Sequence, residues 1–172
     1  VTRDDLPDGG ASHFAKVIRK IREECPGTDI EVLTPDFQGN VDCVNTVLHE
    51  VPTVFNHNVE TVERLSRQIR SKADYKRSLK VLNSAMELSN GLIPVKSGLM
   101  VGMGETDEEV QQTICELFNT GVRILTIGQY LPPGPKHWKL ERYVEPEKFA
   151  LWERFARDMG FTFVASGPLV RS

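Results

Sequence analysis

The side chains best suited to chemistry lie at 56–61, which reads Asn-His-Asn-Val-Glu-Thr. This stretch follows a short apolar run at 51–55 and precedes a segment with helical spacing. Asn58 and Glu60 are two positions apart, so an extended backbone would place both side chains on one face. An amide beside a carboxylate suits hydrogen bonding to a ribose or another polyol. The same spacing also fits a helix start, with Asn58 as the N-cap and Glu60 near the positive end of the helix dipole.

Strand and helix patterns alternate around this stretch. Apolar runs predict five strands, at 30–33, 54–55, 94–101, 122–127 and 161–165. Helical spacing and capping signals predict one helix with Ser12 as its N-cap and another that starts at a capping box of Thr106 and Glu109. Further helices are predicted to begin at Val41 and Pro146, with two more between 62 and 86. This rhythm predicts a parallel sheet with helices outside it, as part of a (β/α) barrel or of an open α/β sheet.

Polar or glycine-rich signatures follow the predicted strands, and a further one opens the chain. They lie at 3–10, 34–37, 56–61, 96–105 and 128–131. Together they would line one mouth of a barrel, which is where barrel active sites lie. Gly102 and Gly104 would let the backbone approach a bulky ligand, and their N–H groups could take a carboxylate or a phosphate.

Composition limits the function classes. The 172 residues are 40% hydrophobic and 26% charged, with a net charge of −3, which fits a single domain over 1–172 and gives no sign of nucleic-acid or membrane binding. No apolar run approaches the roughly 20 residues that span a bilayer. Cys25, Cys43 and Cys115 match no compact metal motif, so buried free thiols are expected.

Six segments in one order resemble lipoyl synthase, a family of radical S-adenosylmethionine enzymes. They lie at 3–11, 33–37, 57–61, 96–105, 126–131 and 166–172 and span nearly the whole chain. The resemblance implies a partial (β/α)6 TIM-like barrel. In that family one 4Fe–4S cluster cleaves S-adenosylmethionine to a 5′-deoxyadenosyl radical, which abstracts hydrogens from C6 and C8 of a protein-bound octanoyl-lysine. A second, auxiliary cluster donates the sulfur atoms.

The resemblance also implies roles for particular residues. Asn58 and Glu60 would contact the ribose, and the glycine strand would pack beside the adenine through Gly98, Gly102, Gly104 and Glu105. Asp8-Gly9-Gly10 would lie near the methionine amino group, although a plain turn fits as well. Ser172 would ligate the auxiliary cluster, although an ordinary terminal residue is the alternative. Arg171, Lys96 and Gln129 would lie near the substrate or cluster, with a barrel-wall role equally open for Lys96. For His57 a structural hydrogen bond is expected.

One departure from the family is large. The family has Cys-x3-Cys-x2-Cys and Cys-x4-Cys-x5-Cys motifs for its two clusters, and neither spacing occurs here. We therefore expect the chain to be a piece of a longer enzyme, cut at both ends and inactive alone. The implied partners are octanoylated lipoyl-domain proteins, namely 2-oxoacid dehydrogenase E2 subunits and glycine cleavage H protein. The implied location is the cytoplasm, or an organelle matrix in a eukaryote.

Three alternatives remain open from the sequence. A biotin-synthase-like enzyme shares the radical chemistry, but the segments at 96–100 and 167–172 argue against it. A metal-free aldolase or isomerase barrel would use Lys96 as a Schiff base and needs a desolvated amine there. A non-catalytic domain would serve only as a scaffold for an acyl-carrying protein.

Overall fold

The computed structural model describes residues 3, 5–70 and 72–171, which form one five-stranded parallel sheet. Neighbouring strands are consecutive in the chain, in the order β1 (Glu31–Leu33), β2 (Val54–Asn56), β3 (Val95–Val101), β4 (Ile124–Gln129) and β5 (Phe163–Gly167). A sheet wound in one direction keeps its helices on one side, as a barrel wall does. The predicted parallel α/β arrangement is therefore confirmed.

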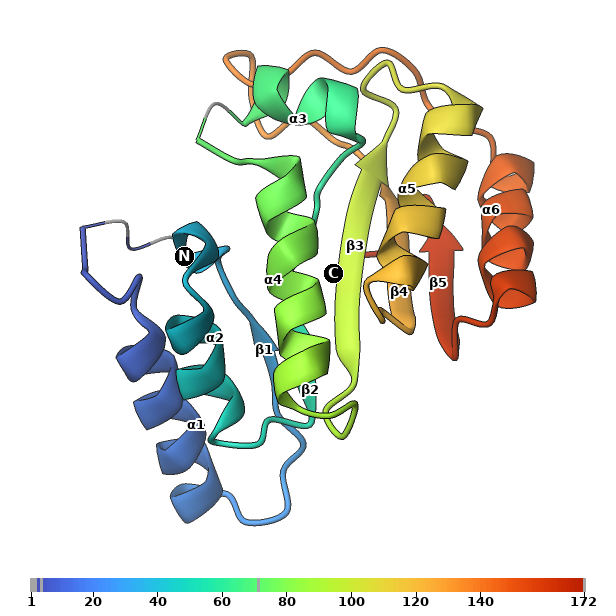
Figure 1. The fold of residues 1–172 in the computed structure, drawn as a ribbon. Helices are drawn as coiled ribbons and strands as arrows, with labels where there is room; N and C mark the ends of the chain where they lie inside the picture. The colour runs from blue at the N-terminus through green and yellow to red at the C-terminus, as the bar shows by residue number, and fades with distance from the viewer. Residues whose placement is uncertain (1–2, 4, 71, 172) are drawn as a thin grey trace.

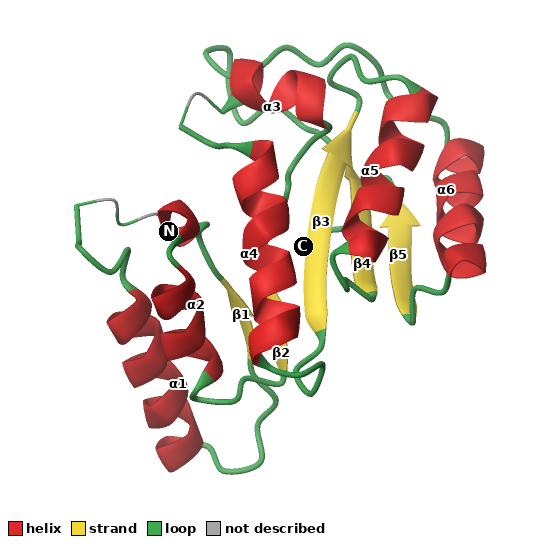
Figure 2. Ribbon diagram, in the orientation of Figure 1, coloured by secondary structure: helices red, strands yellow, loops and turns green. Residues whose placement is uncertain are grey.

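Helices cover one side of this sheet, as Figure 1 shows. They are α1 (Ala11–Glu24), α2 (Val41–Leu48), α3 (Glu63–Ile69), α4 (Tyr75–Leu88), α5 (Asp107–Asn119) and α6 (Pro146–Met159), with one 3-10 turn, η1 (Phe37–Gly39). Figure 2 shows α3 above the upper end of β3, where the strands finish. The other side of the sheet, called here the helix-free face, is formed by alternate strand positions, among them Glu31, Leu33, Lys96, Gly98 and Thr126.

The core lies between the sheet and the helices. Leu125 and Ile127 of β4 are fully buried, as are Ile114 of α5 and Trp152 of α6. Each such side chain contributes roughly 1.5–3 kcal/mol relative to an exposed one. Leu125 and Ile127 alternate along β4 with Thr126 and Gly128. The strand therefore directs apolar side chains toward the helices and has polar or small residues on the helix-free face.

Local sequence signals set most element ends. Thr106 and Glu109 form the predicted capping box, and Gly160 ends α6 in a left-handed conformation. One cap was wrong: Ser12 lies inside α1, and its backbone N–H donates to the Asp8 carboxylate at 2.9 Å. Strands β4 and β5 each begin two residues later than predicted, because apolar residues at 122 and 161 pack in the core before pairing starts.

Candidate functional site

The stretch that follows β2 is fastened to β3 at its carboxyl end. The Glu60 N–H donates to the Gly98 carbonyl at 3.1 Å, and the Met100 N–H donates to the Glu60 carbonyl at 2.8 Å. Glu60 has a left-handed backbone, with φ of 68°, so the extended geometry expected there is wrong. Strain of this kind costs of order 1–3 kcal/mol and often marks a ligand site.

His57 anchors this stretch through hydrogen-bond contacts at both of its ring nitrogens. Its Nδ1 lies 2.9 Å from the Thr34 carbonyl and its Nε2 lies 2.9 Å from the Ser78 hydroxyl. Burial lowers the pKa of His57, which favours the neutral ring. Both ring nitrogens are therefore occupied, and the expected structural role of His57 is confirmed.

Two clefts meet at Asn58 and Glu60, which line both of them. The larger has a volume of 860 Å³ and is walled by the ends of β1 and β2, the segment before α4 and the first turn of α4, through residues that include Thr34, Asp36, His57, Ile69, Arg70 and Arg77. The smaller has a volume of 260 Å³ and lies on the helix-free face, with walls that include Gly98, Met100, Thr126, Gly128, Gln129 and Arg171. Asn58 and Glu60 thus lie where an elongated ligand could occupy both clefts.

The electrostatics at this junction favour a ligand that forms hydrogen bonds. Burial raises the pKa of the Glu60 carboxyl, while the nearby Arg70 charge and the Asn58 side chain oppose that shift. The Thr126 hydroxyl is buried beside the smaller cleft and has no hydrogen-bond partner among the residues described. A buried hydroxyl without a partner costs free energy, so a polar ligand atom here would be stabilising.

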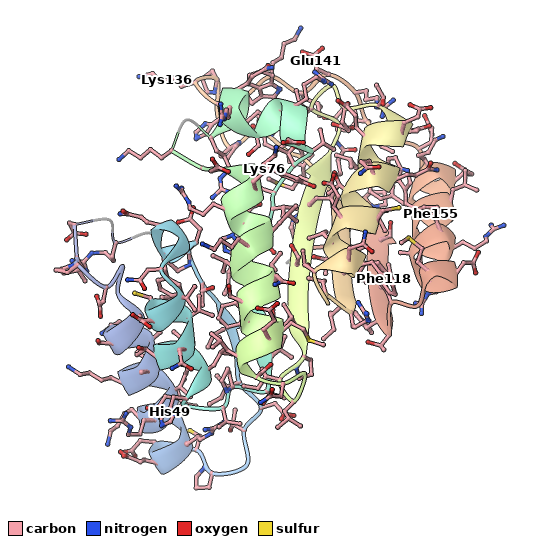
Figure 3. All side chains as sticks on the ribbon, viewed as in Figure 1. His49, Lys76, Phe118, Lys136, Glu141 and Phe155 are labelled. Atoms are coloured by element: carbon pink, nitrogen blue, oxygen red, sulfur yellow. The ribbon has the colours of Figure 1, made fainter. Side chains whose placement is uncertain are left out.

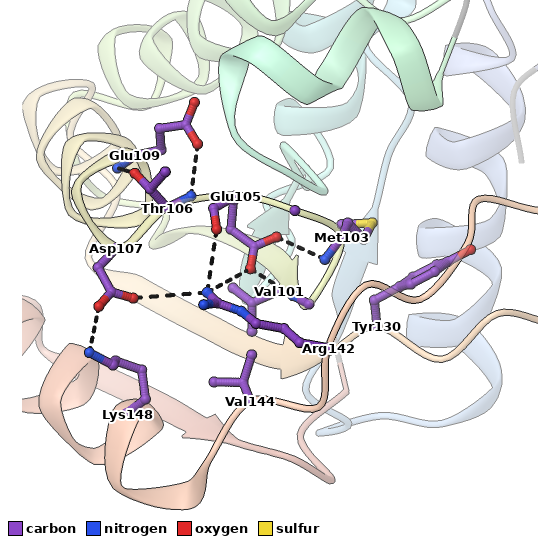
Figure 4. A network of polar contacts seen from close by, with 12 residues as sticks. Val101, Met103, Glu105, Thr106, Asp107, Glu109, Tyr130, Arg142, Val144 and Lys148 are labelled. Atoms are coloured by element: carbon purple, nitrogen blue, oxygen red, sulfur yellow. Dashed lines mark hydrogen bonds and ion pairs between the residues drawn. The ribbon is translucent and has the colours of Figure 1, made fainter.

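The Gly-x-Gly turn after β3 is held by Glu105. Its carboxylate, whose side chain is 0% exposed, accepts hydrogen bonds from the Gly102 and Met103 N–H groups at 2.7 and 2.9 Å. Arg142 approaches the same carboxylate at 3.4 Å, as Figure 4 shows. Gly102 has φ of 101°, and a Cβ there would lie 2.6 Å from the Arg142 carbonyl oxygen. Glu105 is thus committed to the turn and is absent from both cleft walls.

Gln129 anchors the loop that follows β4. Its Nε2 donates to the Val101, Tyr130 and Arg142 carbonyls at 3.0–3.2 Å, and its Oε1 accepts from the Val144 N–H at 2.9 Å. Gln129 also lines the smaller cleft. Its amide is saturated by the backbone, so it shapes that wall.

Asp8-Gly9-Gly10 forms a turn at the start of α1. The Asp8 carboxylate accepts from the Gly10 and Ser12 N–H groups, both at 2.9 Å. Hydrogen bonding by the Ser12 side chain, followed by these two backbone contacts, lowers the pKa of Asp8 to about 2. Gly9 packs against Phe37, and none of the three residues lines either cleft. In this structure the segment has the geometry of the plain-turn alternative.

Lys96 is largely buried on the helix-free face, with 13% of its side chain exposed. Its Nζ lies 2.7 Å from the Glu31 carboxylate, which also accepts from Asn56 Nδ2 at 2.8 Å. This ion pair occupies the amine, whereas a Schiff-base lysine must have its nitrogen free to attack a carbonyl carbon. The contact therefore supports a barrel-wall role and disfavours the aldolase alternative.

The described ranges contain no cluster site of their own. Within them, no three His, Cys, Asp or Glu side chains are arranged to hold a metal ion. Cys43 is buried as expected, but Cys25 is exposed and Cys115 is half-buried, so burial was wrong for Cys25. Ser172 lies outside the described residues. Arg171 donates to the Val170 carbonyl at 2.7 Å and borders the smaller cleft. None of the described helices is long and apolar enough to cross a membrane.

Arg70 and Thr126 are among the cleft residues that were not identified from the sequence. Arg70 follows α3 and lines the larger cleft, and Thr126 lines the smaller one. The signal for Thr126 was present, since a hydroxyl two positions before Gly128 must share its face of β4. Arg70 carried no comparable signal, because the loop that places it has no regular period.

Known proteins resemble this chain in sequence and in fold. The sequence is 54% identical over 172 residues to lipoyl synthase of Rubrobacter xylanophilus, covering 100% of this chain and 53% of that protein. It is 49% identical over 173 residues to mitochondrial lipoyl synthase of Drosophila grimshawi, covering 100% of this chain and 47% of that one. The chain thus spans about half the length of these curated relatives.

The fold comparison agrees with a partial barrel. The crystal structure of methylornithine synthase superposes with a TM-score of 0.67 at 13% sequence identity, over 88% of this chain and 51% of that one. At so low an identity the likeness concerns the fold alone. The family model for the radical SAM superfamily matches residues 1–117, which is more than half of the chain. With its parallel half-barrel and a cleft-lining pair at the carboxyl ends of the strands, the chain belongs to the radical SAM superfamily.

Proposed function

We propose that this chain is part of a lipoyl synthase, which inserts two sulfur atoms at C6 and C8 of a protein-bound octanoyl-lysine. The observation that carries the proposal is the identity of 54% across the whole chain to a relative of that name. The position of Asn58 and Glu60 at the junction of two clefts supports it, because an amide and a carboxylate can form hydrogen bonds with the ribose hydroxyls of a nucleoside-bearing cofactor. In this proposal residues 1–172 form a single radical SAM core domain.

The residues around the junction fit S-adenosylmethionine. Asn58 and Glu60 would bind the ribose hydroxyls, and the buried Thr126 hydroxyl would meet a polar atom of the ligand in the smaller cleft. Gly98 has no side chain to fill that wall, so a flat ring could lie close to the backbone there. When bound, this cofactor and the iron–sulfur clusters supply the radical and the sulfur.

The remaining site residues shape the surroundings of the ligand in this proposal. Gly102, Gly104 and Glu105 form the turn after β3, and Gln129 lines the smaller cleft and fixes the loop that follows β4. Asp8, Gly9 and Gly10 set the start of α1 and lie outside the cleft walls. We propose that they lie near the methionine end of the cofactor once other parts of the protein complete the site.

The iron–sulfur clusters do not fit the described residues. Thiolates normally hold such clusters, and Cys25, Cys43 and Cys115 do not converge within the part of the chain that is described. We propose that other parts of the protein supply the cysteines of two clusters and that Ser172 adds an oxygen ligand to the auxiliary one. Arg171 and Lys96 would then lie near the substrate.

The proposed substrates are octanoylated lipoyl domains, as in 2-oxoacid dehydrogenase E2 subunits and glycine cleavage H protein. The proposed location is the bacterial cytoplasm or an organelle matrix, and one relative carries the word mitochondrial in its name. The test is to reconstitute the whole protein with iron and sulfide and to supply octanoylated H protein. We expect a mass increase of two sulfur atoms on the acyl group, dependent on S-adenosylmethionine. A reconstituted protein that cleaves the cofactor but leaves the octanoyl group unchanged would refute the proposal.

A further inference from the structure

Positive charge is concentrated at the mouth of the clefts. Residues 63–80 contain seven basic and two acidic side chains, a net charge of +5, whereas the whole chain has −3. The loop at 131–143, which follows β4, adds three basic side chains and one acidic one. The remainder of the chain is therefore strongly acidic, and the asymmetry sets this mouth apart from the other surfaces.

Six of these cations form a surface that we call the basic rim. Arg70 and Lys72 border the larger cleft. The other four are exposed residues of the neighbouring elements: one on α3, one in the first turn of α4 and two in the loop at 131–143, which passes close to α3 in Figure 1. The set is Arg67, Arg70, Lys72, Lys76, Lys136 and Lys139. Figure 3 labels Lys76 below α3 and Lys136 above it. The rim thus draws on α3, the segment after it, the first turn of α4 and the loop at 131–143.

Most of this charge is not neutralised from within the protein. Arg67 and Lys76 are 84% and 82% exposed, and their contacts with Asp74 and Glu63 are long, at 3.8 and 3.6 Å. Such exposed pairs contribute little. Lys72, Lys136 and Lys139 form no ion pair with any side chain in the described ranges. These charges are free to act on an approaching surface.

A rigid frame holds the two halves of the rim together. Trp138 Nε1 donates to the Met103 carbonyl at 3.0 Å, and the Tyr130 hydroxyl donates to the Trp138 carbonyl at 2.9 Å. From the other half, Arg64 of α3 donates to the Gly104 carbonyl at 2.8 Å. Both halves are thus attached to the same turn after β3. A preformed arrangement of charges loses less entropy on binding than a flexible one.

We propose that the basic rim docks an acidic surface of the protein domain that carries the octanoyl-lysine. This inference rests on the proposed function and names the face that meets the substrate. A cleft of 860 Å³ holds a cofactor and an acyl-lysine arm but no folded domain, so the domain stays outside while its arm enters. The surface left facing the domain is the rim. Its uncompensated cations favour carboxylates and speed association.

The experiment compares two double charge reversals that change the net charge by the same amount. Lys136→Glu with Lys139→Glu alters the rim, and Lys16→Glu with Arg154→Glu alters exposed sites on α1 and α6. We measure the affinity of the whole protein for an octanoylated H protein by fluorescence anisotropy, without clusters, and then KM in the reconstituted enzyme. The rim variant should weaken binding about 10- to 30-fold at low salt and less than about threefold at 0.5 M salt. The control should stay within about twofold.

Several outcomes would overturn the inference. One is equal weakening by the rim and control variants, which would indicate a general charge effect. Another is an unchanged affinity of the rim variant for the octanoylated domain, or an equal rise in KM for a short uncharged octanoyl-lysine peptide. Tighter binding of wild type to a nucleic-acid duplex than to the carrier domain would also refute it. A wild-type enzyme that forms no lipoyl group tests the proposed function instead, because the anisotropy measurement needs no turnover.

Discussion

Replacing Glu105 by glutamine should destabilise the protein without a direct effect on the cofactor. The carboxylate accepts from Gly102 N–H at 2.7 Å and from Met103 N–H at 2.9 Å in a fully buried site. Glutamine keeps one acceptor and turns an amide N–H toward the second backbone donor. One bond to a charged group is lost and one buried donor is left without a partner, at about 3 kcal/mol together. For a domain of this size, that lowers Tm by about 6–12 °C.

The assay for Glu105→Gln is thermal and urea unfolding of the whole protein, followed by the Kd for S-adenosylmethionine at a temperature where the variant is folded. Glu108→Gln is the matched control, because Glu108 is exposed in the first turn of α5, the helix that follows Glu105, and its replacement makes the same change in charge. It should change stability by no more than about 0.5 kcal/mol. A Glu105→Gln variant of wild-type stability that binds the cofactor more than tenfold less tightly would refute the reasoning, because it would put the carboxylate on the ligand.

Three further predictions concern the residues at the cleft junction, Gly128 of β4 and His57. Asn58→Ala and Glu60→Gln should each raise the Kd for S-adenosylmethionine at least about tenfold with Tm within a few degrees, and an unchanged Kd would contradict the ribose role. Gly128→Ala should displace the segment at 168–171, because a Cβ there would overlap the Val170 carbonyl oxygen, and faster amide exchange in that segment would report it. Burial lowers the pKa of His57 below its ordinary 6.5, so the unfolded state takes the proton first and stability falls as pH drops below about 6.5. His57→Asn should remove this dependence, which urea titrations of the wild type and the variant at several pH values would measure. If the two proteins lose the same stability as the pH falls, another group causes the dependence.

The helices were the most predictable part of the fold. Caps and breakers such as Thr106 with Glu109, Pro146 and Gly160 act within a few residues, so the sequence carries them locally. The strand starts were less predictable. Residues 122 and 161 are as apolar as the strands that follow them. Only backbone pairing with a neighbouring strand distinguishes the strand itself from the buried residues that precede it.

The location of the candidate site could be predicted from the sequence, but the hydrogen-bond partners of its residues could not. Asn58 and Glu60 were identified from spacing and from their position after a strand, and both line the two clefts. Glu105 and Gln129 look like ligand residues in the sequence, yet backbone groups of their own surroundings occupy their polar atoms. Which backbone groups bond to these side chains depends on the folded conformation of the turns around them, so no local sequence pattern reveals it.

The sequence by itself determined the alternation of elements, the family and the pair at 58 and 60, because periodicity, capping and motif order are properties of the chain. The tertiary structure decided which polar groups remain available. It gave Lys96 a carboxylate partner and enclosed Glu105. It buried the Thr126 hydroxyl beside the smaller cleft without a partner among the described residues, and it left the basic rim largely exposed. The physical reason is that a polar group buried on folding must find a partner, and the partner comes from whichever segment the fold brings within about 3 Å.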